Sequence, residues 1–155
     1  NSITDFESAG AVVGDVITLG AATTTPTTAV GAVPVIGTIT AVEAGEETAY
    51  GTFASGASNT IDLLIVTATN GAGDLSADLV DGTQLLTDII ADPAKGITSV
   101  ANAEFYILAF DDTSAYLYYA HEQNNTTLVD SEIVLISVIS NITAGSFVAE
   151  DFILG

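Results

Sequence analysis

The fold is decided by the stretch 104–121, which reads EFYILAF (104–110), DDTS (111–114) and AYLYYAH (115–121). Aromatic and apolar residues favour strands, and a short loop rich in Asp and Ser favours a hairpin turn. Successive side chains of a strand point to opposite faces. Phe105, Ile107 and Ala109 should therefore share one face, and Tyr106, Leu108 and Phe110 the other. A hairpin that is apolar on both faces is expected inside a sandwich or against a partner subunit.

Further strands are expected on both sides of this hairpin. The run 61–69 (IDLLIVTAT) is continuously apolar in its middle, which is typical of a strand buried on both faces. Residues 133–139 are expected to form another buried strand. Shorter strands are expected at 2–6 and 15–19 around a turn, at 36–42, at 48–53, and at 147–154, where the last strand joins the sheet of the hairpin.

A single helical segment is expected near 77–91, because Leu75, Leu79 and Leu86 follow helical spacing and Asp92-Pro93 stops the pattern. No linker divides the 155 residues. The sequence therefore predicts one domain over 1–155. Its fold class is mainly β, an antiparallel β-sandwich-like domain with one short helical segment near 77–91.

The charge balance excludes several classes of partner. Twenty Asp and Glu residues face one basic residue, Lys95, for a net charge of −19. Nucleic acids and anionic membrane surfaces need cationic side chains, which this chain lacks. Membrane insertion is not expected either, since no apolar run approaches the roughly 18 residues of a spanning helix. Repulsion among the carboxylates must be relieved by spreading them over the surface or by divalent cations. Calcium, which takes six to eight oxygen ligands, suits the second remedy.

Two acidic loops are candidate calcium sites. Glu43 and Glu46 flank Gly45, which permits a tight bend, and Asp111 and Asp112 lie at the tip of the hairpin. Plain solvation is the alternative for both loops, because Asp is an ordinary turn former.

No arrangement of catalytic residues is found in the sequence. There is no cysteine, and the single histidine, His121, has no nucleophile elbow to serve. We therefore expect a non-catalytic protein. The tyrosines of 116–119 offer a stacking surface for sugars, so cell-surface polysaccharide is a candidate partner, although strand aromatics also pair across a sheet.

The two ends of the chain carry a family resemblance. Ile3-Thr4-Asp5-Phe6 and Gly14-Asp15-Val16-Ile17-Thr18-Leu19 resemble the "I-x-D-F … G-D-x-I-x-L" segment of RTX proteins, the calcium-binding secreted proteins of Gram-negative bacteria. The last third is similar to their C-terminal part, and the likeness spans residues 1–20 and 103–155. Its motifs are Tyr116-Leu117-Tyr118, an acidic residue near Asp130, the apolar run 133–138, and the closing Asp151-Phe152-Ile153-Leu154.

The resemblance implies an extracellular or cell-surface location reached by type I secretion. It also implies that Asp5 and Asp15, which match acidic positions of the family, contribute to a calcium site. The glycine-aspartate repeats G-G-x-G-x-D that bind stacked calcium ions in the family are absent here. In such a family the region is the C-terminal domain of a larger protein or a stand-alone relative.

The leading hypothesis is an extracellular structural protein that assembles with itself into a surface layer or filament, stabilised by calcium. The strands at 61–69, 104–110 and 132–139 are almost free of charge, and one lysine cannot protect the sheet edges. Pairing that does not close gives filaments or lattices. The alternative is a C-terminal secretion and calcium-binding module of an RTX exoenzyme or adhesin. A free-standing hydrolase is a third and weaker hypothesis.

Overall fold

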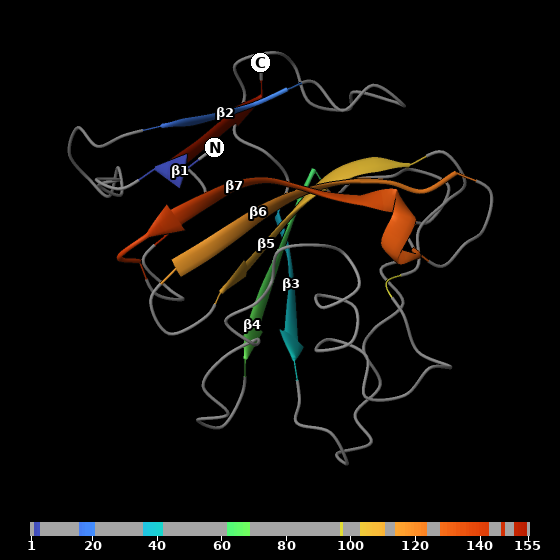
Figure 1. Cartoon of the computed structure of the whole chain (residues 1–155), viewed down its shortest axis with the longest axis horizontal. Coiled ribbons are helices and arrows are strands. Elements are labelled where there is room, and N and C mark those ends of the chain that lie inside the picture. Colours follow the sequence, from blue (N-terminus) through green and yellow to red (C-terminus); the bar gives the residue numbers. More distant parts are fainter. Residues whose placement is uncertain are drawn as a thin grey trace.

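The computed structural model describes residues 2–3, 16–20, 36–41, 62–68, 97, 103–110, 114–123, 128–142, 147 and 151–154. This part of the chain is mainly β-strand, with one turn of 3-10 helix, η1 (Asp130–Glu132), before β7 (Figure 1). The mainly β fold class is thereby confirmed. The helical segment near 77–91 and the strand at 48–53 lie outside the described residues.

The strands form two sheets (Figure 1). The larger sheet has six strands in the order β1-β7-β6-β5-β4-β3, and the smaller pairs β2 with β8. In chain order the strands are β1 (Ser2–Ile3), β2 (Ile17–Leu19), β3 (Ile36–Ala41), β4 (Leu63–Ala68), β5 (Glu104–Phe110), β6 (Ser114–His121), β7 (Ile133–Ser140) and β8 (Phe152–Leu154).

The hairpin of the last third is confirmed. β5 and β6 pair antiparallel from Glu104 opposite His121 to Phe110 opposite Ala115. β6 continues antiparallel into β7, with a register shift between Leu117 and Tyr118. The centre of the sheet is thus built from the apolar runs that the sequence marks most strongly.

The expectation of a mainly antiparallel sheet does not match the pairing of the described strands. β3 pairs parallel with β4, β4 with β5, β1 with β7, and β2 with β8. Parallel neighbours need a long crossover connection rather than a tight turn. The segments 42–62 and 69–103, which join β3 to β4 and β4 to β5, are long enough for this. The large sheet is therefore mixed, with its antiparallel part confined to β5, β6 and β7.

Both ends of the chain differ from the expected arrangement. β1 and β2, the two strands expected around a turn, do not pair with each other: β1 joins the edge of the large sheet and β2 pairs with β8. The closing strand, β8, does not join the sheet of the hairpin but lies in the smaller sheet. These pairings link residues far apart in the chain, and no local pattern encodes them.

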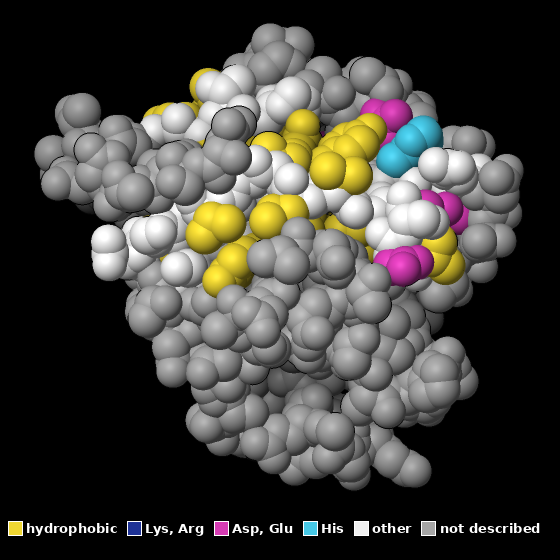
Figure 2. Space-filling model, in the orientation of Figure 1, with side chains coloured by type: hydrophobic (Ala, Val, Ile, Leu, Met, Phe, Trp, Pro, Cys, Tyr) yellow, Lys and Arg dark blue, Asp and Glu magenta, His cyan; other side chains and the backbone are white. Residues whose placement is uncertain are grey.

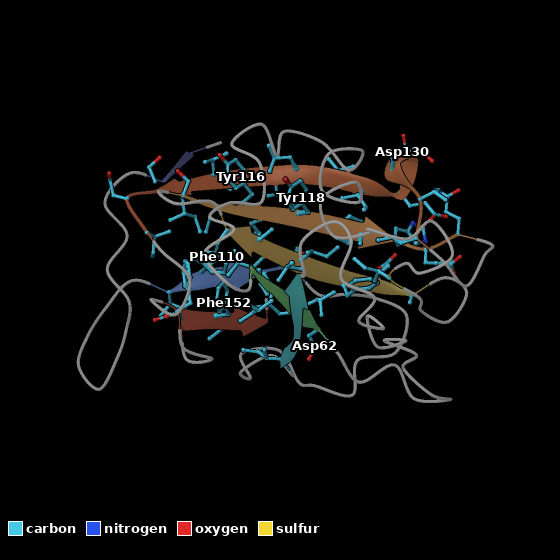
Figure 3. The ribbon with its side chains drawn as sticks, turned by 90° about the horizontal axis from the view of Figure 1, so that it is seen from below. Asp62, Phe110, Tyr116, Tyr118, Asp130 and Phe152 are labelled. Carbon is cyan, nitrogen blue, oxygen red and sulfur yellow. The ribbon has the colours of Figure 1, made fainter. Side chains whose placement is uncertain are left out.

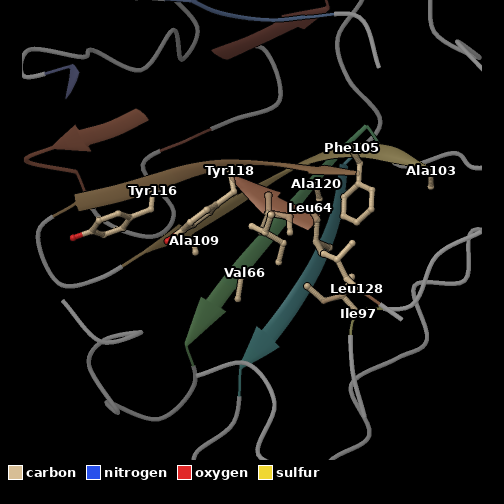
Figure 4. Packing of buried hydrophobic residues seen from close by; sticks show 12 residues of the cluster. Leu64, Val66, Ile97, Ala103, Phe105, Ala109, Tyr116, Tyr118, Ala120 and Leu128 are labelled. Carbon is tan, nitrogen blue, oxygen red and sulfur yellow. The ribbon is translucent and has the colours of Figure 1, made fainter. Parts of the chain in front are cut away.

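Both faces of the hairpin are buried, as its alternation predicts. On one face Phe105, Ile107 and Ala109 belong to the first core cluster (Figure 4). The other members of this cluster come from β4, β6, β7 and the segments between strands: Leu64, Val66, Ile97, Ala103, Tyr116, Tyr118, Ala120, Leu128 and Ile133. The strand predicted at 61–69 is confirmed as β4, and its successive residues Leu63 and Leu64 are buried on opposite faces.

The second core cluster joins the large sheet to the small one. Tyr106, Leu108 and Phe110 meet residues of β2, β4, β6, β7, β8 and the segment between β7 and β8 there, namely Leu19, Leu63, Ala115, Leu117, Ile139, Ile142, Phe147 and Phe152. Phe147 bridges the sheets, with its ring centroid 5.9 Å from that of Phe110 and 5.3 Å from that of Phe152. Figure 3 shows Phe110 and Phe152 on neighbouring elements of this region. The small sheet is thus held against one face of the large one by aromatic contacts.

Candidate functional site

The acidic residues predicted to bind calcium all lie outside the described residues. They are Asp5, Asp15, Glu43, Glu46, Asp111 and Asp112. Within the described ranges, no group of three or more Asp, Glu, His or Cys side chains is placed to hold a metal ion. Calcium binding at these loops therefore stays a prediction. Within the described residues, three other features lie near the open end of the hairpin.

The first feature is a polar group at the base of the hairpin, formed by Glu104, Tyr106, Tyr119 and His121. Glu104 lies opposite His121 and Tyr106 opposite Tyr119, so all four side chains fall on the same face of the sheet. His121 Nε2 is 4.0 Å from Glu104 Oε1, and the Tyr106 hydroxyl donates a hydrogen bond of 3.2 Å to the Gly20 carbonyl. The rings of Tyr106 and Tyr119 meet edge to face, with their centroids 5.7 Å apart. His121, the cyan side chain of Figure 2, lies on the surface beside acidic groups.

The surroundings of this group keep both phenols neutral. Burial, together with the charge of Glu104 and a hydrogen bond to its carboxylate, raises the pKa of Tyr119 to about 12. Burial also raises the pKa of Tyr106, against the opposing effect of its hydrogen bond to Gly20. Neutral phenols donate hydrogen bonds. The hydrogen bond from Tyr106 therefore links the hairpin to Gly20, the residue that follows β2.

The second feature is a pair of buried carboxylates at the corner between β6 and η1. Both oxygens of Glu132 accept backbone hydrogen bonds, one from Gln123 N at 2.9 Å and one from Val129 N at 3.0 Å. Glu122 is completely buried, and neither of its carboxyl oxygens has a hydrogen-bond partner among the described residues. The two acids are thus close in the chain but differ sharply in their surroundings.

The third feature is the outer edge of β7. β1 pairs with Val138 and Ile139 only, and among the residues that the structure describes no strand pairs with the outer side of 133–136. β7 carries no charged residue. Val134 is 59% exposed, and Val129, just before η1, is 39% exposed. We call Val134, Leu135 and Ile136 the β7 edge patch.

Two of these features escaped the sequence analysis. The run 133–139 was expected to be buried throughout, but only Ile133, Ser137 and Ile139 are buried, and Val134 lies largely in solvent. Its exposure follows from the position of β7 near the edge of the sheet, which the sequence does not reveal. Glu122 has a detectable signal, because strand alternation places it on the same face as Tyr118 and Ala120.

The chain matches no protein-family model, no curated protein and no solved structure. In the described part of the chain there is no helix long and apolar enough to cross a membrane.

Proposed function

We propose that this chain is a non-catalytic, extracellular structural protein that assembles with itself into a layer or filament. The observation that carries the proposal is the β7 edge patch, a charge-free strand edge with an exposed valine in a chain of net charge −19. Natural sheets often protect such edges with charges or prolines, and β7 has neither, although the register shift opposite Leu117 and Tyr118 leaves Ile136 without a partner on β6. A second copy of the chain can approach an uncharged edge with the least electrostatic repulsion.

The directions of the strands are compatible with an open-ended, head-to-tail assembly. β3, β4 and β5 run parallel, and two antiparallel steps through β6 make β7 run in the same direction as β3. β1, which is parallel to β7, also runs in this direction, so both outer strands of the large sheet and β7 point the same way. β3 (IGTITA) is also free of charge. Pairing β7 of one copy with β3 of the next would be a head-to-tail contact that does not close and gives a filament.

A sandwich-like layering of the two sheets is part of this proposal. The second core cluster and the Phe147 bridge hold the small sheet against one face of the large sheet. The small sheet lies against one face of the large sheet, and further strands can be added to the large sheet only at its edges. This restriction favours growth in one direction.

Calcium is the proposed counter-ion of the assembly. Copies that each carry a net charge of −19 repel one another, and the chain offers one basic side chain in return. Calcium would neutralise carboxylates between and within copies. A location outside the cell, reached by type I export, follows from the resemblance of both ends to RTX proteins.

A second candidate function is a secretion and calcium-binding module of a larger RTX exoenzyme or adhesin. The two regions that resemble this family, 1–20 and 103–155, are paired with each other through β1 with β7 and β2 with β8. This pairing favours a coherent terminal module. Such a module would remain monomeric at high concentration.

Particle size with and without calcium separates the two functions. We expect the purified full chain to form large particles at high concentration in calcium, visible as filaments or sheets by electron microscopy. Excess chelator should reduce their size, and sodium chloride at matched ionic strength should not replace calcium. A chain that stays monomeric in calcium at every concentration would contradict the structural function and favour the module. Particles whose size is unaffected by chelator would contradict the proposed role of calcium in assembly.

A further inference from the structure

Glu122 is the most unusual charged residue in the described part of the chain. Its side chain is fully buried, and no hydrogen-bond donor among the described residues reaches either carboxyl oxygen. Its backbone N–H donates to the Ala103 carbonyl at 2.9 Å, which extends the β5–β6 ladder by one residue. The position of Glu122 is therefore fixed by the sheet.

Strand alternation sets the direction of this side chain. Tyr118 and Ala120 belong to the first core cluster, and Glu122 is the next residue on the same face. Ala103, opposite Glu122, belongs to that cluster as well. The carboxylate thus lies at the border of the first core cluster, away from Glu104 and His121, which occupy the other face.

An ionised carboxylate without a partner is strongly destabilising in such a place. Buried charges in proteins are paired, hydrogen-bonded or bound to metal ions. The whole sequence offers only Lys95 and His121 as cationic side chains, and His121 faces Glu104 instead. Glu132, the other buried acid of this corner, already has both oxygens occupied by backbone N–H groups.

We propose that Glu122 is a ligand of a bound calcium ion. This inference deepens the calcium part of the proposed function by assigning it a site. A carboxylate oxygen is a hard ligand, and calcium can complete its shell with backbone carbonyls and water, so a single acidic side chain can anchor the ion. A transition metal is disfavoured, because the chain has no cysteine and its only histidine lies on the opposite face.

The test compares the full-length chain with Glu122→Gln, which removes the charge and keeps the shape. Asp130→Asn is the matched control, because Asp130 is an exposed acid of the same corner. Bound calcium is counted by equilibrium dialysis. Terbium, a calcium substitute whose luminescence is sensitised by tyrosine, reports on the site because Tyr118 lies on the same face of β6. Thermal unfolding is followed with calcium and with chelator.

We expect Glu122→Gln to bind one calcium ion fewer, to lose the sensitised terbium signal and to lose the rise in Tm that calcium gives the unchanged chain. In chelator its Tm should equal or exceed that of the unchanged chain, because a buried charge has been removed. Asp130→Asn should keep the ion and the signal. If Glu122→Gln does not fold, Glu122→Asp decides, with weaker calcium binding expected.

Two results would overturn the site. One is an unchanged ion count and terbium signal in Glu122→Gln, and the other is the absence of calcium binding by the unchanged chain. Ion binding is measured separately from particle size. A chain that binds calcium through Glu122 but never assembles would therefore refute the proposed assembly and leave the site intact.

Discussion

At the scale of single residues, the open end of the hairpin separates two kinds of acid. Glu104 shares its face with two tyrosines and a histidine, and it accepts a hydrogen bond from Tyr119. Glu122, on the other face, has no such neighbour among the described residues. Glu104 lies opposite His121, whereas Glu122 lies opposite Ala103 at the next position of the β5–β6 ladder. Because adjacent positions face opposite sides of the sheet, only Glu104 receives polar partners within the described part of the chain. Strand alternation therefore has direct consequences for charge as well as for packing.

The raised pKa of Tyr119 gives a pH prediction. Its pKa is about 12 in the folded chain against the ordinary value of 10.0, so the folded form holds its proton more tightly than the unfolded form. The stability that this provides is complete below pH 10 and is lost as the pH rises toward 12. We expect Tyr119→Phe to lose less stability over this interval than the unchanged chain, as measured by urea unfolding at each pH.

The titration itself supplies the control for this prediction. The phenolate absorbance of the folded chain should contain a component near pH 12 that is missing in Tyr119→Phe. Tyr106 also has a raised pKa, so part of the late titration should remain. A titration curve that is identical in the two proteins, apart from one tyrosine of ordinary pKa, would contradict the raised pKa of the half-buried Tyr119.

At the scale of elements, the small sheet depends on aromatic contacts. Phe147 lies between Phe110 of β5 and Phe152 of β8, and all three are buried. β2 and β8 are short strands that pair only with each other among the described elements. Two such strands have little stability of their own, so their attachment depends on packing against the large sheet.

Removing the bridge should therefore loosen the small sheet before the large one. We expect Phe147→Ala to cost about 3 kcal/mol of unfolding free energy, within the usual range for a buried Phe. Hydrogen exchange should speed up most at β2 and β8. Phe105→Ala, in the first core cluster, is the comparison: it should lower the global stability without selective exchange in the small sheet. Equal exchange in both variants would show that Phe147 does not hold β8 in place.

The hairpin and β4 could be predicted because their information is local. Alternation and a continuous apolar run are properties of neighbouring residues, and they correctly placed Phe105 and Tyr106 on opposite buried faces. The parallel pairs could not be predicted in this way. The partner of β8 lies at Ile17–Leu19, near the other end of the chain, and no pattern of neighbouring residues indicates this pairing.

The candidate sites were predictable to a smaller degree. An excess of carboxylates indicates that the chain binds cations. The positions of the cation sites, however, depend on which acids are buried close together in the fold. Glu122 could have been singled out from alternation alone, since it continues the face of Tyr118 and Ala120. Val134 could not, because its sequence neighbours are as apolar as those of a central strand and only the strand order makes it an edge residue.

At the scale of the whole molecule, two properties stand in opposition. The net charge of −19 keeps copies apart, whereas the charge-free edges of the large sheet favour their association. Ions shift this balance, because they weaken the repulsion without changing the edge. We therefore propose that calcium promotes self-assembly by weakening this repulsion.

We propose that the β7 edge patch joins one copy to the next, and sedimentation of Val134→Lys in calcium provides the test. The added lysine lowers the net negative charge, so general repulsion between copies decreases. A charge at the strand edge, however, blocks pairing. Val16→Lys is the matched control, because Val16 is also an exposed valine, at 47%, but precedes β2. We predict that Val134→Lys stays monomeric while Val16→Lys assembles like the unchanged chain. Assembly of Val134→Lys to the same size as the unchanged chain would contradict the account.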